Sequence, residues 1–278
     1  MEITAVEPSR PTKITVWLAL LLLAAIAWTV IVVQTQAMDS LDRDMGDMSM
    51  SDDMPEMAIN QGMAQMAVEP TSLLFFLPLW ISMMVAMMFP AVAPVVSFFA
   101  ALSRKRREVG QSATPTWIFL AGYLAVWSLF GLGAYLLSLV VPALGMMAPG
   151  LHVDNPLAAG IVLALAGLYQ LSPLKQVCLH HCRSPLSIIL HGWRDGNGGA
   201  FRMGFVHGAY CLGCCWGLML VLFAVGLMNL LWMIILTVVI FAEKVLPYGP
   251  LIAKLTALAL IGFGLVTLTM PWLGGMSG

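Results

Sequence analysis

Five cysteines fall into two short clusters, and each cluster contains histidine. The first is the sequence Cys-Leu-His-His-Cys at residues 178–182. On a helix, Cys178 and Cys182 share one face because residues four apart lie one above the other, and His181 lies beside them. Two thiolates and one imidazole within a few ångströms suit Zn(II) or Cu(I). His180, on the other side of such a helix, is a weaker candidate ligand.

The second cluster occupies residues 207–216. On a helix, His207, Cys211 and Cys214 form one stripe, and Cys215 lies at its edge. Histidine inside an apolar segment needs a partner or a function. Free cysteine also packs as a small apolar residue, which explains single cysteines here but explains the first cluster poorly. The two clusters together therefore predict a site for a soft metal ion.

A membrane thiol redox enzyme is the rival chemistry. It requires an oxidising face or access to a quinone, whereas cytoplasmic thiols stay reduced. The neighbours Cys214 and Cys215 are also too constrained on a helix to form a disulfide easily. We therefore favour metal binding, expect no enzymatic activity, and keep redox chemistry as an alternative.

Two methionine pairs lie in the apolar sequence 81–90. Met83 stacks over Met87, and Met84 over Met88, near the middle of the predicted membrane segment. Stacked thioethers favour Cu(I), but methionine also packs well without any ligand role, so both interpretations stay open. The pattern resembles the Met-x-x-x-Met element of eukaryotic-type high-affinity copper transporters, although chain length and number of membrane segments differ.

A second methionine-rich segment, residues 38–66, holds eight methionines and seven acidic residues. It has almost no aliphatic residue to form a core and is expected to be disordered when free. Thioethers suit Cu(I) and carboxylates suit Cu(II), so the segment is a candidate copper collector in an oxidising compartment, where cysteine would oxidise. An acidic flexible linker is the alternative. Met48, Met50 and Met54 are its candidate ligands.

The composition indicates the element type that must position these residues. The chain is 60% hydrophobic and 10% charged, with mean hydropathy +0.90, which is too few charges for a soluble domain of this length. Membrane lipid is therefore a partner, and the absence of a basic domain argues against nucleic acid. Seven apolar runs are long enough for membrane helices. They are residues 14–33, 72–102, 115–141, 156–174, 202–228, 229–246 and 251–270.

Basic residues cluster after the second run, between the fourth and fifth, and between the sixth and seventh. The positive-inside rule then places the N-terminus in the cytoplasm and the C-terminus outside, as expected for a multi-pass protein of a bacterial inner membrane. Pro173 should kink or end the fourth segment, and a helix continuing past it would carry residues 175–182 into the interface. The sixth segment is short, and it could be a re-entrant segment instead of a full membrane span.

These patterns predict an all-α polytopic helix bundle with about seven spans. Its expected parts are a cytoplasmic N-terminus with a retained anchor helix (1–37), a flexible extracytoplasmic Met/Asp-rich loop (38–71) and a membrane core (72–278). Glu243 lies near the inner end of the sixth segment. It is expected to pair with Lys244 or snorkel to the interface; the alternative is that it neutralises a bound cation or relays a proton.

The segments around residues 169–185 and 208–216 carry the motifs Cys-x-x-x-Cys-Arg-Ser-Pro and Cys-x-Gly-Cys-Cys-Trp. With the methionine pairs and the segment from Glu243 to Pro247, they resemble a bacterial family of predicted metal-binding integral membrane proteins, a domain of unknown function. The resemblance covers roughly residues 72–270. It implies metal binding without implying a substrate, a direction or a mechanism.

We therefore interpret the chain as a membrane protein that handles copper, by uptake or transfer across the inner membrane, with zinc as a second possible ion. The order from outer methionines to inner thiols suits uptake or handover. A metallochaperone or assembly subunit for a membrane metalloenzyme is the first alternative, and a homo-oligomer is the other partner considered. Two further alternative functions are a thiol redox enzyme and a structural subunit whose cysteines only pack. No phosphate-cradling loop for ATP-driven pumping is present in the sequence.

Overall fold

The computed structural model describes residues 10–48, 70–111, 114–140, 156–184, 193–225 and 229–274. Every regular element in these ranges is an α-helix, which confirms the all-α fold class. The helices are α1 (Arg10–Met48), α3 (Pro70–Glu108), α4 (Thr116–Val140), α5 (Pro156–Leu171), α6 (Pro173–Arg183), α8 (Gly196–Val225), α9 (Leu230–Val245) and α10 (Gly249–Gly274).

Each of the seven predicted membrane segments coincides with a helix. Among the described residues, α1, α3, α4, α8 and α10 are long and apolar enough to cross a membrane, and α5 with α6 forms a sixth candidate bent by 62°. The remaining helix, α9, has only 16 residues, in line with the predicted short sixth segment. The chain is thus a helical membrane protein, and its orientation stays a prediction.

The bend between α5 and α6 lies at Ser172 and Pro173. Ser172 is extended and accepts a hydrogen bond from the backbone N–H of Lys175, and Pro173 takes the first position of α6. Serine is a favoured N-cap, and proline fits the first helical turn because it lacks an N–H that would otherwise be unsatisfied. The predicted kink at Pro173 is therefore present, and the helix beyond it carries the first cysteine cluster.

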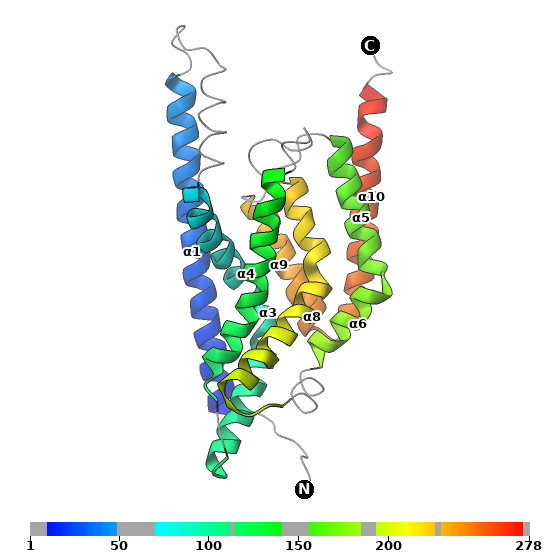
Figure 1. Ribbon diagram of the computed structural model, residues 1–278. Coiled ribbons are helices and arrows are strands. Elements are labelled where there is room, and N and C mark those ends of the chain that lie inside the picture. The colour runs from blue at the N-terminus through cyan, green and yellow to red at the C-terminus, as the bar shows by residue number, and fades with distance from the viewer. Residues whose placement is uncertain are drawn as a thin grey trace.

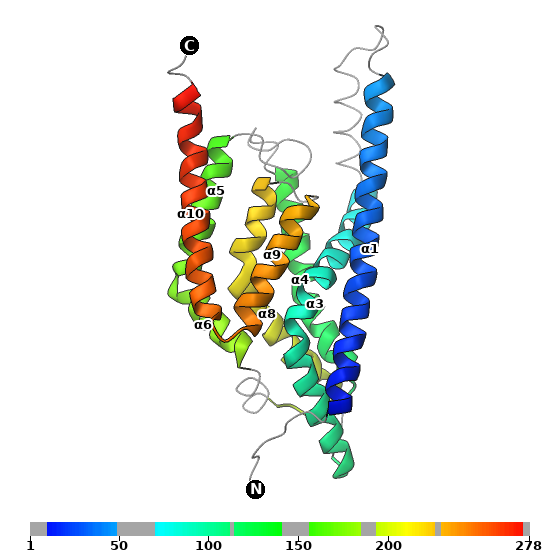
Figure 2. The same cartoon turned by 180° about the vertical axis from the view of Figure 1, so that it is seen from behind.

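The helices form a row with α1 at one edge and the pair α5 and α10 at the other (Figures 1 and 2). Helix α1 packs on α3, and α10 packs on α5. Between these edges, α8 contacts α4, α5, α6 and α9, while α3 contacts α4 and α9. Helix α8, with the second cysteine cluster, is therefore at the centre of the bundle.

Small residues allow α4 and α8 to cross closely. A Cβ added to Gly204 would overlap the carbonyl oxygen of Phe119, and one added to Gly122 would overlap that of Phe201. Close backbone approach at glycine is a common way to pack helices in membranes, where apolar burial gives little driving force. The crossing brings Tyr123 of α4 to the cysteine-bearing face of α8.

Polar contacts gather where α1 begins, α3 ends and α8 begins. Arg104 donates to the Thr12 hydroxyl (3.2 Å), and Arg106 forms an ion pair with Asp195 (2.6 Å). These helix ends lie at the same end of the bundle (Figure 1). The basic residues that follow the second predicted segment therefore share one end with the start of α1, as the predicted topology requires.

Helix α1 continues to Met48, beyond the predicted boundary at residue 37. The first part of the predicted Met/Asp-rich loop is therefore helical. Residues 49–69, with the candidate ligands Met50 and Met54, lie outside the described residues, and so does the side chain of Met48.

Candidate metal centre

The two cysteine clusters meet at the contact between α6 and α8. The sulfur of Cys214 lies 3.6 Å from the sulfur of Cys182, and Cys211 lies one turn before Cys214 on α8. All three side chains are buried, with exposed fractions of 7% or less. All five cysteines of the chain are free thiols, so the centre contains thiols that are available for ligation.

Three further helices contribute to this centre, in addition to α6 and α8. The hydroxyl of Tyr123, from α4, lies 3.0 Å from the sulfur of Cys211. The Nζ of Lys244, from α9, lies 2.9 Å from the same sulfur. It also lies 3.8 Å from the Sδ of Met88 on α3 and 4.0 Å from the Sγ of Cys215. Five helices therefore surround one cluster of sulfur atoms.

The thiols on α8 also contact their own helix. Cys214 and Cys215 both donate to the carbonyl oxygen of Cys211, at 3.1 and 2.9 Å. Such bonds to a carbonyl one turn earlier satisfy a thiol or hydroxyl inside a helix. They hold both sulfurs close to the helix axis and beside Cys211.

The first cluster divides between two environments. Cys182 meets the thiols of α8, whereas the sulfur of Cys178 lies against Gly213, where a Cβ would be only 2.7 Å from it. His181 stacks on Tyr210, with ring centroids 4.5 Å apart, and its Nδ1 contacts the carbonyl of Val177. The structure thus places Cys182 in the centre and gives His181 other partners.

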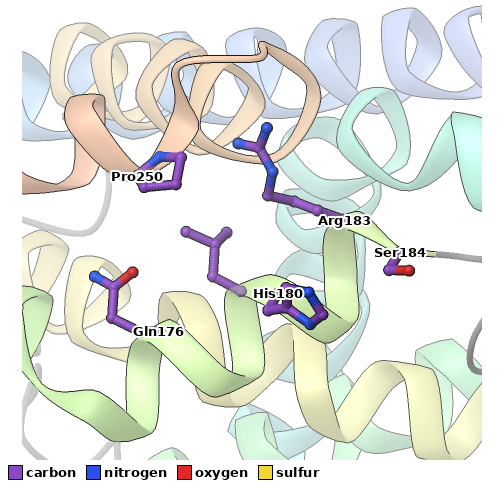
Figure 3. A pocket seen from close by; sticks show the side chains of 6 residues that line it. Gln176, His180, Arg183, Ser184 and Pro250 are labelled. Atoms are coloured by element: carbon purple, nitrogen blue, oxygen red, sulfur yellow. The ribbon is translucent and has the colours of Figure 1, made fainter.

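His180 is exposed and lines a cavity of about 350 Å³ between α6 and the start of α10. Figure 3 shows it near Gln176, while Arg183 reaches toward the turn between α9 and α10. Arg183 donates there to the carbonyls of Glu243 and Pro247, at 2.7 and 3.1 Å. This cavity does not contain a cysteine.

His207 lies one turn before Cys211 on α8 and is 2% exposed. Its ring lies near those of Phe119 and Tyr123, with centroids 6.1 and 6.0 Å away. Its Nδ1 is buried without a hydrogen-bond partner in the structure. A buried, unpartnered imidazole nitrogen is costly, and ligation of a metal ion next to Cys211 would satisfy it.

The four methionines of α3 are all buried. Met84, Met87 and Met88 have no exposed surface, and Met83 is 6% exposed. Met88 touches Lys244 and therefore borders the thiols. The methionine pairs thus lie inside the bundle rather than against lipid, and the first of the two interpretations, a role with Cu(I), remains compatible with their position.

Glu243 has a partner different from the expected Lys244. Its Oε2 lies 2.6 Å from the Nζ of Lys175, and its Oε1 accepts a 3.0 Å hydrogen bond from Gln170. Lys175 also contacts Gln170. Both carboxylate oxygens are engaged, so Glu243 pairs with α5 and α6 instead of facing the sulfur cluster.

Across the described part of the chain, no group of three or more His, Cys, Asp or Glu side chains has the geometry of a metal site. The sulfur pair Cys182–Cys214 comes nearest. Two sulfurs bound tetrahedrally to one zinc ion at ~2.3 Å lie about 3.8 Å apart, so the observed 3.6 Å separation allows both to bind one ion. A donor set of thiols and a thioether favours a soft ion such as Cu(I).

Fold and site together define a polytopic helical membrane protein with a buried thiol–thioether centre. A family model described as PpoB2, copper chaperone, matches residues 77–267. The chain therefore belongs to this copper chaperone family, which supports copper as the associated metal ion and gives no support to zinc. No curated protein and no solved structure matches the chain. The resemblance to predicted metal-binding membrane proteins stays a prediction beside this copper-related family.

Sequence reasoning did not place two residues of the centre. Tyr123 carried no signal, because a tyrosine in an apolar segment is common at membrane interfaces. Lys244 was considered only as a basic residue near the end of a segment and as the expected partner of Glu243. A lysine directly after a glutamate in a short apolar helix was the available signal, since two ionisable groups there need partners.

Proposed function

We propose that this protein is a membrane-embedded copper chaperone that carries Cu(I) on the thiols of Cys182, Cys211 and Cys214. The observation that carries the proposal is the 3.6 Å contact between Cys182 of α6 and Cys214 of α8. It joins the two predicted clusters into one centre of soft ligands, which suit Cu(I). The family supports a role with copper.

The buried position suits a carrier of Cu(I). Each of the three thiols is at most 7% exposed, so a bound ion is shielded from water and from oxidants. The helix α6 ends one residue after Cys182, which places one ligand of the centre near a helix end. Copper would be released by ligand exchange with thiol or thioether ligands of a recipient, and a membrane metalloenzyme is the recipient we expect.

A second candidate function is uptake or transfer of copper across the membrane. The buried methionines of α3 favour it, because Met88 borders the thiols through Lys244. Met84 and Met87, also fully buried, would continue this series of soft ligands along the helix. Flux of Cu(I) into liposomes that contain only this protein distinguishes transport from a chaperone that requires a recipient.

The test is the copper content of the detergent-purified protein after loading with Cu(I) under reducing conditions. The wild type is expected to retain nearly stoichiometric copper. The variants Cys182→Ser and Cys214→Ser are expected to lose most of it, because oxygen is a poor ligand for Cu(I). Serine at position 214 can keep the bond to the carbonyl of Cys211, so the fold should persist.

Cys178→Ser is the matched comparison. It makes the same substitution on α6 one turn earlier, at a sulfur that lies against Gly213. We expect this variant to retain copper. A wild type that binds no copper would overturn the proposal, and equal losses in the Cys178→Ser and Cys182→Ser variants would overturn the assignment of ligands.

A further inference from the structure

Lys244 places a positive charge inside the sulfur cluster. Its Nζ lies 2.9 Å from Cys211, 3.8 Å from Met88 and 4.0 Å from Cys215. A lysine that snorkels to the interface directs its charge to water; this one directs it at the thiols.

No carboxylate neutralises this charge among the described residues. The adjacent Glu243 is turned to the other side of α9, where Lys175 and Gln170 occupy both of its oxygens. An ammonium group in an apolar interior requires a compensating anion or a function. The sulfur cluster is the site at which Lys244 acts.

We infer that Lys244 is a specificity-determining residue that makes the centre favour monovalent Cu(I) over divalent ions. This inference rests on the proposed function. A fixed positive charge beside a metal site repels an ion in proportion to the charge of that ion. Zn(II) therefore experiences twice the unfavourable interaction of Cu(I), and the low effective dielectric of the interior enlarges the difference.

Discrimination by charge is useful here because the thiols alone do not distinguish Cu(I) from Zn(II). Cysteine sulfur binds both Zn(II) and Cu(I), and the 3.6 Å separation between Cys182 and Cys214 is compatible with a zinc ion. Lys244 also contacts Met88, whose thioether suits Cu(I). The ammonium group adds discrimination against a divalent ion that the sulfur geometry does not provide.

The experiment compares the wild type with Lys244→Leu. Leucine removes the charge and, unlike methionine, adds no ligand for copper. Both proteins are loaded in detergent under reducing conditions with Cu(I) and Zn(II) in competition, and bound metal is measured by elemental analysis. We expect the ratio of bound Cu(I) to Zn(II) to fall at least about tenfold in Lys244→Leu, since a unit charge at this range in a poorly screened site changes binding strongly.

Two variants keep the result interpretable. Lys254→Leu makes the same substitution at an exposed position on α10 and should leave the ratio unchanged. Lys244→Arg keeps the charge and should keep most of the preference for Cu(I), although the guanidinium has a different shape. If Lys244→Leu cannot be purified in a folded state, Lys244→Gln replaces it in the same assay.

The possible outcomes separate the inference from the proposed function. Copper bound by the wild type with a ratio unchanged in the charge-removing variant would overturn the inference and leave the chaperone proposal intact. A ratio that falls in Lys244→Leu and also in Lys254→Leu would overturn it as well. A wild type without bound copper would overturn the proposed function itself.

Discussion

Two lysines are directed into the bundle within a short distance of each other, and they have different partners. Lys175 has no exposed side-chain surface and pairs with Glu243 at 2.6 Å. Lys244, the residue directly after Glu243, is partly buried and faces sulfur atoms. The charge of Lys175 is neutralised by the carboxylate of Glu243, and the ammonium group also contacts the amide of Gln170. This lysine therefore contributes to the fold. The second has no such partner among the described residues, so its charge is available to the metal centre.

The comparison shows how neighbouring positions on α9 serve different tasks. Consecutive residues on a helix point about 100° apart, and α9 contacts α3, α6, α8 and α10. Glu243 therefore joins α9 to α6, and Lys244 joins α9 to the thiols. The ion pair between Lys175 and Glu243 holds α6, which carries Cys182, against α9. Breaking this ion pair should therefore lower both the stability of the protein and its copper retention.

The largest expected effect is that of Glu243→Gln. This change leaves the charge of Lys175 buried without a counter-ion, which typically costs about 3–5 kcal/mol. The free energy of unfolding, measured by reversible unfolding in mixed detergent micelles, should fall by that amount. Copper retention should also fall, because α6 is no longer held against α9.

The control for this prediction is the double variant Lys175→Met/Glu243→Gln. It removes the unpaired charge, and replacing a buried ion pair by uncharged groups is often close to neutral. Most of the lost stability should return. If Glu243→Gln and the double variant were equally unstable, the buried charge of Lys175 would not be the cause.

An intermediate effect is expected for Cys211→Ser. Its sulfur is the closest partner of Lys244 and also contacts Tyr123. A serine hydroxyl is smaller than the thiol and lies farther from the ammonium group, which is then left poorly satisfied. Hydrogen bonds to charged groups contribute roughly 1.5–3 kcal/mol, and the free energy of unfolding should fall within this range. An unchanged value would show that Lys244 has a different partner in the membrane.

Much of the fold could be predicted because apolar length is a strong signal in a membrane protein. The break at Pro173 was predictable from a local rule, and the capping by Ser172 confirms it. The extension of α1 to Met48 was not predictable, since residues 38–48 carry polar and acidic side chains without an apolar run. Their helical state continues that of the apolar part of α1.

The site could be predicted in part. The stripe on α8 follows from helical spacing, and the burial of Cys211 and Cys214 agrees with one side of that helix facing the interior. Spacing on α6 treated Cys178 and Cys182 as equivalent, whereas only Cys182 meets the thiols of α8. Which sulfur faces which residue depends on how α6 crosses α8 after the 62° bend, and a single sequence does not contain that geometry.

The smallest expected effect on stability is that of Lys244→Leu, and this variant tests the comparison between the two lysines most directly. Removing Lys244 leaves no unpaired carboxylate among the described residues, because Glu243 keeps Lys175 and Gln170. Replacing a partly buried cation by an apolar group is close to neutral, so the free energy of unfolding should change by no more than about 1 kcal/mol. The same unfolding assay measures it, with Lys254→Leu as the exposed control. A loss as large as that of Glu243→Gln would place both lysines in the fold, whereas a small loss with a changed Cu(I) to Zn(II) ratio assigns Lys244 to the metal centre.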